Sequence, residues 1–381
     1  MAGLYLHIPF CKQACYYCDF HFSTNQSQKT ELVEQIAHEL YLQRDYLQGE
    51  PIETIYFGGG TPSLLTGKEL DILFTAIHKN YQVLENPEIT LEANPDDLSL
   101  IKLEEIQSAG INRLSIGIQS FDETVLRFLN RAHTAQEALL CLDQARMAGI
   151  SNLSIDLIYS IPGQDDELLH KNLAMAIKLK PTHISAYSLT LEEKTVFGRW
   201  ASHGKLTAME ENLSAGQFEI VMDILTQHGY HHYEISNFCL PGYESKHNTS
   251  YWQQKKYLGV GPSAHSFDGD SRQFTISNNP LYIKSLREDR IPFEREVLTR
   301  ENKINEYLFT SLRTDRGCSL SYLSSQLEYN LMKKNESYLD QLVKGKLIEI
   351  THDTLVLTRS GKLVADRIAS DLFAGEETNL K

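Results

Sequence analysis

The chain of 381 residues has no long hydrophobic run, little cysteine and no excess of basic residues. No apolar segment approaches the length needed to cross a bilayer, and the N-terminus lacks the pattern of a signal peptide, so we expect a cytoplasmic protein. Lys and Arg number 36 against 50 Asp and Glu, which gives a formal net charge of −14. This net charge argues against electrostatic binding to nucleic acid or to an anionic membrane.

Half of the six cysteines lie in one short segment, residues 11–18, with the spacing C-x3-C-x2-C. The other three, Cys141, Cys239 and Cys318, are isolated in the sequence, and we interpret each as a small apolar residue. Disulfides fit poorly because nothing suggests export, and a reducing compartment suits free thiolates.

Three thiolates so close together predict a metal site. Cys11, Cys15 and Cys18 can take three corners of a four-iron cube and leave the fourth iron open for chemistry. The alternatives are a structural zinc completed by His7 or His21, and a chance grouping of cysteines.

Apolar segments with strand character alternate with segments of helical periodicity over the first half of the chain. The helices are expected near 30–46 and 67–81, and the strands after the first apolar run at 54–57, 88–92, 113–119, 152–158 and 183–189. Two units look alike, Ala109 to Ile116 and Ala148 to Ile155, each with a glycine between helix and strand. This order predicts an α/β fold with a parallel sheet, either a partial or complete β/α barrel or a doubly wound open sheet.

We expect two domains, at 1–290 and 295–375. The second shows three short helices, a hairpin over 347–357 and a final helix at 361–372, the pattern of a winged-helix module. From residue 295 onward it balances 13 basic against 13 acidic residues, so we interpret it as a lid or protein-contact domain.

Residues suited to ligand binding fall where strands of the predicted sheet end, the usual position of active sites in parallel β/α folds. The triplet 58–60 lets the backbone approach a ligand closely, but it matches neither phosphate-binding glycine motif and is also consistent with a plain turn. Glu92, Gln119 and Asp156 end the next three strands, and Arg131 follows the fourth. Such charges are either ligand contacts or structural ion pairs.

The cysteine spacing, with Tyr17 before the third cysteine, resembles the radical S-adenosylmethionine superfamily. The phrase Tyr5-Leu-His-Ile-Pro-Phe-Cys11, followed by Cys18-Asp-Phe20, is similar to the branch that contains the oxygen-independent coproporphyrinogen dehydrogenases and a group of haem chaperones. The resemblance implies a partial (β/α)6 TIM-like barrel with a C-terminal helical, winged-helix-like domain. It also implies a [4Fe-4S] cluster on the three cysteines, whose open iron is chelated by the amino and carboxylate groups of S-adenosyl-L-methionine.

The same resemblance implies which residues contact or flank the cofactors. Tyr17 packs beside the cluster, and the other positions that match cofactor contacts are Tyr5, Gly59, Gly60, Thr61, Glu92, Gln119, Arg131 and Asp156.

Three features decide between members of the branch. The porphyrinogen-oxidising members have a fourth cysteine where this sequence has Phe20, and they have an N-terminal arm for which no room precedes Tyr5. The phrase His247-Asn248-Thr-Ser-Tyr251-Trp252 matches H-N-x-x-Y-W, which is associated with haem binding in the chaperones. Histidine can ligate iron and aromatic rings can stack on the macrocycle. An Asn turn with packed aromatics explains the bare pattern better, so the haem interpretation depends on the resemblance.

We therefore predict a chaperone that binds haem, beside the barrel mouth, and passes it to an acceptor protein. It would touch a membrane only transiently, if that acceptor is membrane-bound, and would lack coproporphyrinogen dehydrogenase activity. His265 is the alternative haem ligand. The rival functions are radical oxidative decarboxylation of coproporphyrinogen III and a zinc-stabilised binding protein.

Overall fold

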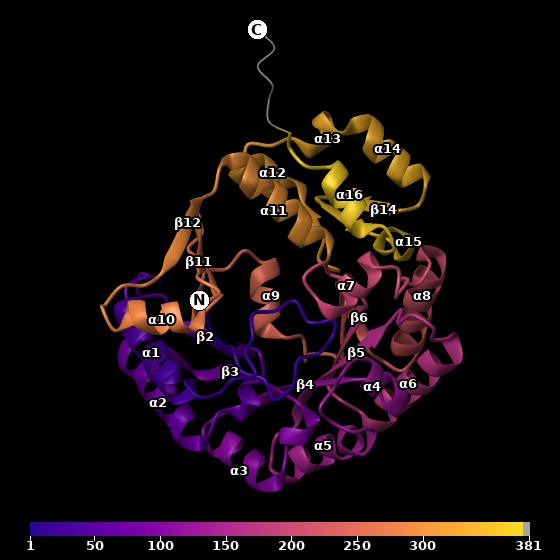
Figure 1. Cartoon of the computed structure of the whole chain (residues 1–381). Coiled ribbons are helices and arrows are strands. Elements are labelled where there is room, and N and C mark those ends of the chain that lie inside the picture. The colour runs from indigo at the N-terminus through magenta and orange to yellow at the C-terminus, as the bar shows by residue number, and fades with distance from the viewer. Residues whose placement is uncertain (376–381) are drawn as a thin grey trace.

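Six parallel strands, paired in chain order, form the centre of a computed structural model that describes residues 1–375. The sheet bends into an open arc, with helices along its convex side (Figure 1). These strands are β1 Ala2–Ile8, β2 Ile52–Gly59, β3 Val83–Ala93, β4 Arg113–Gln119, β5 Asn152–Tyr159 and β6 His183–Ser188.

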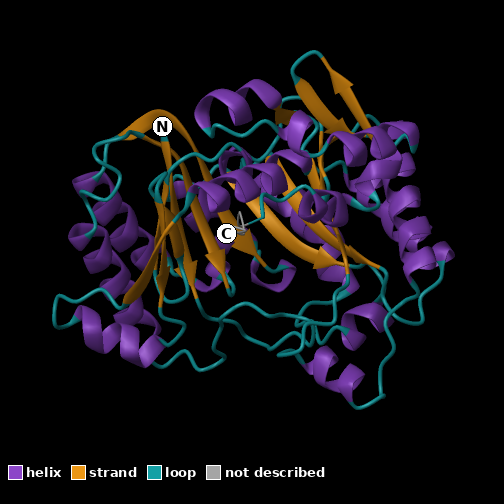
Figure 2. Cartoon of the chain, turned by 90° about the horizontal axis from the view of Figure 1, so that it is seen from above, coloured by secondary structure: helices purple, strands orange, loops and turns teal. Residues whose placement is uncertain are grey.

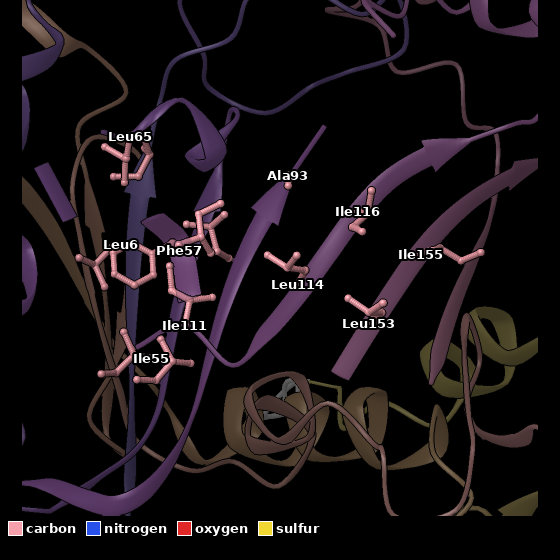
Figure 3. Packing of buried hydrophobic residues seen from close by; sticks show 14 of the residues in the cluster. Leu6, Ile55, Phe57, Leu65, Ala93, Ile111, Leu114, Ile116, Leu153 and Ile155 are labelled. Atoms are coloured by element: carbon pink, nitrogen blue, oxygen red, sulfur yellow. The ribbon is translucent and has the colours of Figure 1, made fainter. Parts of the chain in front are cut away.

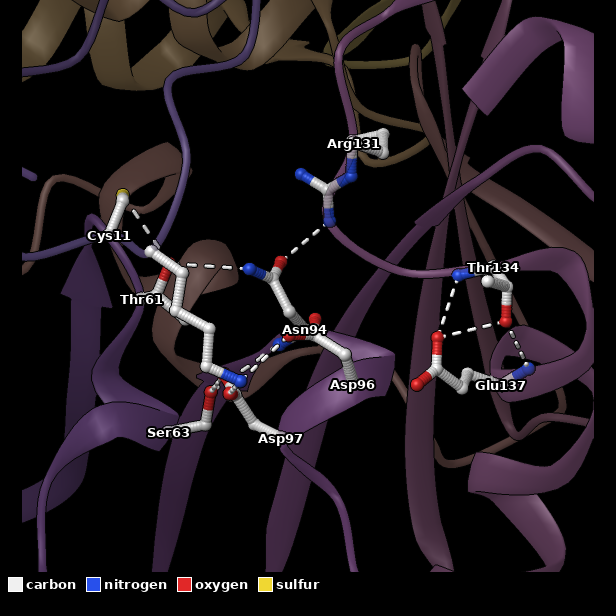
Figure 4. A network of polar contacts seen from close by, with 10 residues as sticks. Cys11, Thr61, Ser63, Asn94, Asp96, Asp97, Arg131, Thr134 and Glu137 are labelled. Carbon is white, nitrogen blue, oxygen red and sulfur yellow. Dashed lines mark hydrogen bonds and ion pairs between the residues drawn. The ribbon is translucent and has the colours of Figure 1, made fainter. Parts of the chain in front are cut away.

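The connections between these strands are helical and pack on the outside of the arc. They are α1 Lys29–Leu42, α2 Gly67–Asn80, α3 Leu100–Ser108, α4 Glu123–Phe128, α5 Ala135–Met147 and α6 Asp166–Leu179, with the short 3₁₀ turns η1 Pro62–Leu64 and η2 Pro95–Asp97. Thr134 and Glu137 form a capping box that fixes the start of α5 (Figure 4). The repeated glycines, Gly110 and Gly149, have φ of 97° and 89°, because each ends a helix in the left-handed region before the next strand.

Alternation along the strands separates an apolar outer face from a polar inner face. Leu6 of β1 pairs in register with Phe57 of β2, and both are fully buried against the helices (Figure 3). The preceding residues, Tyr5 and Tyr56, also pair and lie on the opposite, inner face. The inner face therefore carries the groups available for binding.

A second set of elements extends the sheet at both edges, in the order β12-β11-β10-β9 beside β1 and β8-β7 beside β6. They are α7 Val196–Ser202, α8 Glu211–Gln227, β7 His231–Glu234, β8 Asn237–Cys239, α9 Lys246–Trp252, β9 Tyr257–Val260, β10 His265–Phe267, β11 Ser271–Thr275, α10 Asn279–Leu286 and β12 Phe293–Val297. The polarity of segment 268–279 suggests a plain surface connection, but the structure contains strand β11 there. Strand β11 buries Ser271, Gln273 and Thr275, and Gln273 donates to Gln43 (3.1 Å).

The C-terminal part has its own hydrophobic core, built from residues between Ile304 and Leu372. Its elements are α11 Arg300–Leu312, β13 Cys318–Ser319, α12 Leu320–Gln326, α13 Leu331–Lys334, α14 Glu336–Lys344, β14 Ile348–Thr351, β15 Thr354–Leu357, α15 Arg359–Lys362 and α16 Ala365–Asp371. Four helices precede the β14–β15 hairpin, where the sequence pattern suggests three, and the single helix expected at 361–372 is split into α15 and α16. This part lies across the open side of the arc (Figure 1).

The predicted fold class, an α/β fold organised on parallel strands, is confirmed. Among the described residues no helix is long and apolar enough to span a membrane.

Candidate functional site

The cysteine segment leaves the end of β1 and lies over the carboxyl ends of the parallel strands. The strand arrowheads point to one edge of the molecule, where long loops gather (Figure 2). Contacts on both sides hold the segment in place, among them a bridge between Phe10 and Ser23 and a hydrogen bond from Tyr16 N to Leu129 O (3.2 Å). The loop is therefore shaped by the protein on both sides.

All three cysteines of the segment are free and half-buried. Burial raises the pKa of Cys11 to about 11 and that of Cys18 to about 12. Thiols in such surroundings ionise only when a cation compensates the charge, so metal binding here must release protons.

A cavity of about 650 Å³ opens between this loop and the strand ends. It brings together most of the residues that the sequence singled out, namely Cys11, Cys15, Tyr17, Cys18, Gly59, Gly60, Thr61, Glu92, Gln119, Arg131 and Asp156. They come from β1 through β5 and the loops that follow, so residues far apart in sequence share one chamber. Of the expected cofactor contacts, Tyr5 does not line it; its buried hydroxyl lies 3.1 Å from Nδ1 of His7.

Arg131 ties the cysteine loop to two strand ends. Its guanidinium donates to Cys15 Sγ (3.3 Å), to Asn94 Oδ1 (2.6 Å) and to Gly117 O (2.7 Å). Asn94 in turn donates to Thr61, whose hydroxyl donates to Cys11 Sγ (3.4 Å), as Figure 4 shows. This buried cation is the nearest positive charge available to stabilise thiolates in the loop.

The glycine triplet is needed because the backbone passes too close to the cysteine loop for any side chain. A Cβ on Gly60 would come within 2.7 Å of Phe10 O, and one on Gly59, which has φ of 110°, within 2.7 Å of the His7 ring. The Gly59 amide donates to Glu92 Oε2 (3.1 Å). The triplet thus forms a wall of bare backbone beside a buried carboxyl.

Two carboxyls on the inner face, Glu92 and Asp156, line the cavity. Burial raises the pKa of Glu92 to about 7 and that of Asp156 to about 6. Tyr56 donates to Glu92 (2.8 Å), and the buried guanidinium of Arg113 opposes both shifts. These groups can accept hydrogen bonds from hydroxyl or amino groups of a bound molecule.

The three cysteines suit a cluster better than a single ion. Within the described residues, no group of three His, Cys, Asp or Glu side chains forms a site for one metal ion. In a [4Fe-4S] cluster each cysteine binds a different iron, so the sulfurs need not converge on one point. The cavity in front of them leaves room for a further ligand.

The H-N-x-x-Y-W phrase lies elsewhere than expected. It forms α9, whose first backbone amides, at Lys246 and His247, donate to Glu88 of β3 (3.1 and 3.0 Å). Glu88 pairs in register with Thr54. Nδ1 of His247 lies 2.7 Å from Thr54 Oγ1, near the start of β2. The helix therefore sits at the opposite end of the strands from the cysteines, because the chain returns beneath the sheet before β9.

His247 is fully engaged inside the barrel. It is 1% exposed, its Nε2 lies 2.8 Å from the Tyr251 hydroxyl, and its ring stacks on that of Tyr56 (5.0 Å between centroids). Burial lowers its pKa to about 3, which keeps the imidazole neutral. Asn248 is half-buried in the same helix, and Trp252 lines a second cavity, described below.

Sequence reasoning missed several residues of the first cavity, among them Asn94, Ser115, Gly117 and Tyr187. Asn94 lies two residues after Glu92, just beyond the end of β3, so its position offered a signal. Tyr187 did not, because an aromatic residue within a predicted strand is ordinarily core.

Comparison with known proteins agrees with this geometry. The model of the radical SAM superfamily matches residues 5–176. A solved structure described as coproporphyrinogen III oxidase (HemN) from Escherichia coli, a radical SAM enzyme, superposes with a TM-score of 0.84 over 98% of this chain and 90% of that one, at 24% identity. The chain therefore has the fold of this solved radical SAM enzyme, and residues 5–176 match the superfamily.

Relatives of higher identity narrow the family. The chain is 35% identical over 379 residues to the haem chaperone HemW of Bacillus subtilis (strain 168), covering 99% of this chain and 100% of the relative. It is 37% identical to HemW of Escherichia coli (strain K12), covering 91% and 98%. The chain belongs to the HemW family.

Proposed function

We propose that this protein is a haem chaperone that binds haem and passes it to an acceptor protein in the cytoplasm, and that it carries a [4Fe-4S] cluster and S-adenosyl-L-methionine. The observation that carries the proposal is the end-to-end similarity to proteins named haem chaperones. The free cysteines support a reducing compartment.

In this proposal Cys11, Cys15 and Cys18 hold the cluster. Bound S-adenosylmethionine would lie against Gly59, Gly60, Thr61, Glu92, Gln119, Arg131 and Asp156, which line one cavity. When bound, the cluster and S-adenosylmethionine together supply one-electron chemistry. The chain's own contribution is to hold the loop through Arg131 and to shield the site.

The rival function, oxidative decarboxylation of coproporphyrinogen III, has less support. Phe20, at the position of the fourth cysteine of the oxidising members, lines the cavity and is 73% exposed. A phenyl ring offers neither a thiol hydrogen nor a metal ligand. The structural likeness to the oxidase shows a shared fold only.

One anaerobic reconstitution tests the proposal. We expect about four iron and four sulfide per chain, uptake of about one haem per chain, and no turnover of coproporphyrinogen III with cofactor and reductant present. Cys15→Ala should lose the cluster and remain folded. Bound zinc without sulfide, or protoporphyrinogen formed over many turnovers, would refute the assignment.

A further inference from the structure

A second cavity, of about 420 Å³, lies where α9 faces the C-terminal part of the chain. Figure 1 shows α9 inside the arc, with α11 on its far side. The walls of this cavity come from β7, α9, α11 and the segment around β13. They include His231, Trp252, Tyr307, Asp315, Arg316 and Tyr322. It shares no residue with the cysteine cavity.

The walls of this cavity are fixed to one another by main-chain bonds. Ile235 N donates to Arg313 O (3.0 Å), and Asp315 N donates to Tyr233 O (3.0 Å). Both bonds join the β7–β8 hairpin to the segment after α11. The cavity is thus a built junction between two parts of the fold.

The two faces of α9 have different roles. His247 and Tyr251 turn toward the barrel interior and bond each other (2.8 Å). Thr249 and Trp252, three residues apart, line the junction cavity. Trp252 Nε1 and Thr249 Oγ1 are buried without a hydrogen-bond partner in the described structure, which is uncommon for buried polar atoms.

His231 offers an accessible imidazole at this cavity. Its side chain is 49% exposed, and Nε2 lies 2.8 Å from Asp315 Oδ2. Nδ1 lies 4.0 Å from Glu244 Oε1, an ion-pair distance that is too long for a hydrogen bond. A carboxylate bound to one ring nitrogen is the usual arrangement behind a metal-ligating histidine, because it fixes the ring and raises its basicity.

The other walls suit a flat ligand with acidic arms. Tyr307 and Tyr322 pack with ring centroids 4.5 Å apart, and Trp252 adds a third aromatic side chain. Arg316 is exposed and forms no ion pair with the described residues, so its guanidinium is free to pair with a carboxylate. Aromatic walls, an oriented imidazole and a free cation together match haem, with its apolar ring, central iron and propionate groups.

We infer that the junction cavity is the haem site and that His231, rather than His247, is the axial ligand, held by Asp315. The inference rests on the proposed chaperone function and names where its cargo binds. Trp252 of the H-N-x-x-Y-W phrase then contacts the cargo, while His247 supports α9 from within.

The test is a haem titration of the full chain, followed at the Soret band. His231→Ala should weaken binding at least tenfold and shift the band, and added imidazole should restore the wild-type spectrum by entering the vacated position. His231→Cys should give a different band, since sulfur replaces nitrogen at iron. The exposed His228, outside the cavity, provides the matched control: His228→Ala should change nothing.

The outcomes separate this inference from the proposed function. Wild-type protein that takes up no haem refutes the chaperone proposal and the inference with it. Haem uptake with an unchanged spectrum and affinity in His231→Ala refutes the inference alone. Cluster content must stay at the wild-type level in every variant, because the two cavities share no residue; a loss in His231→Ala would also overturn it.

Discussion

Glu39, in the last turn of α1, has a carboxyl with no exposure to solvent. It accepts from Gly261 N (2.8 Å) and Gln43 Nε2 (2.8 Å), and the Tyr282 hydroxyl lies 2.5 Å from Oε2. One side chain thus joins α1 to the β9–β10 connection and to α10. Burial outweighs these donors and raises its pKa from 4.5 to about 7.

A raised pKa in the folded state means that folding favours the protonated acid. The stability from this group is therefore complete below about pH 4.5 and declines as the pH rises to about 7, by roughly 3 kcal/mol at most. We expect that Glu39→Gln removes this contribution to the pH dependence of the free energy of unfolding. Urea unfolding at pH 5 and pH 8 checks it, with the exposed Glu34→Gln as control. The same change in the free energy of unfolding between pH 5 and pH 8 in Glu39→Gln and in the wild type would contradict the assignment.

At the scale of the element, α9 depends on a carboxylate from another strand. Ser245 caps the helix through Asn248 N (3.4 Å), and Glu88 of β3 accepts from the amides of Lys246 and His247. A helix of seven residues has little stability of its own, so these contacts and its packing hold it. The orientation of Trp252 toward the junction cavity follows from them.

We predict that Glu88→Ala lowers the free energy of unfolding by about 1–3 kcal/mol, since the amides of Lys246 and His247 lose their acceptor and the bond to His247 is buried. Glu85→Ala, at an exposed position of the same strand, should cost less than about 0.5 kcal/mol. Chemical denaturation measures both. A similar small effect in the two variants would show that Glu88 does not hold α9.

At the scale of the whole molecule, several ion pairs join the barrel to the C-terminal part, and the pair between Arg313 and Glu234 has the most buried carboxylate of them. Arg313 Nε lies 3.1 Å from Oε1 of Glu234, whose side chain is 1% exposed. Arg313 also lies over the Trp252 ring, 5.7 Å from its centroid. The pair thus closes the junction beside the second cavity.

Arg313→Ala should destabilise the protein by about 3 kcal/mol, because it leaves a buried carboxylate without its cation. The exposed pair Arg359–Asp223 spans the same two parts of the chain, and Arg359→Ala should cost less than about 1 kcal/mol. Thermal unfolding, together with the rate of limited proteolysis in the segment that follows α11, compares the Arg313→Ala and Arg359→Ala variants. Equal losses would mean that burial of Glu234 does not matter.

The sequence by itself determined the parallel strands and the cysteine loop, because both depend on local pattern. The apolar residues of strand β4 predict that it begins at Arg113 and ends at Gln119, as it does in the structure. The three cysteines lie within eight residues of one another. The gathering of Glu92 and Asp156 with them also followed, since the ends of parallel strands meet at one edge.

Only the tertiary structure decided where α9 lies and which histidine is accessible. No local pattern in His247 to Trp252 states that the chain passes beneath the sheet, and Thr54, one of the hydrogen-bond partners of His247, lies about 190 residues away in the sequence. The junction cavity likewise requires β7 and the end of α11 to meet, about 80 residues apart. Such sites arise from packing between segments distant in sequence, which residue spacing does not encode.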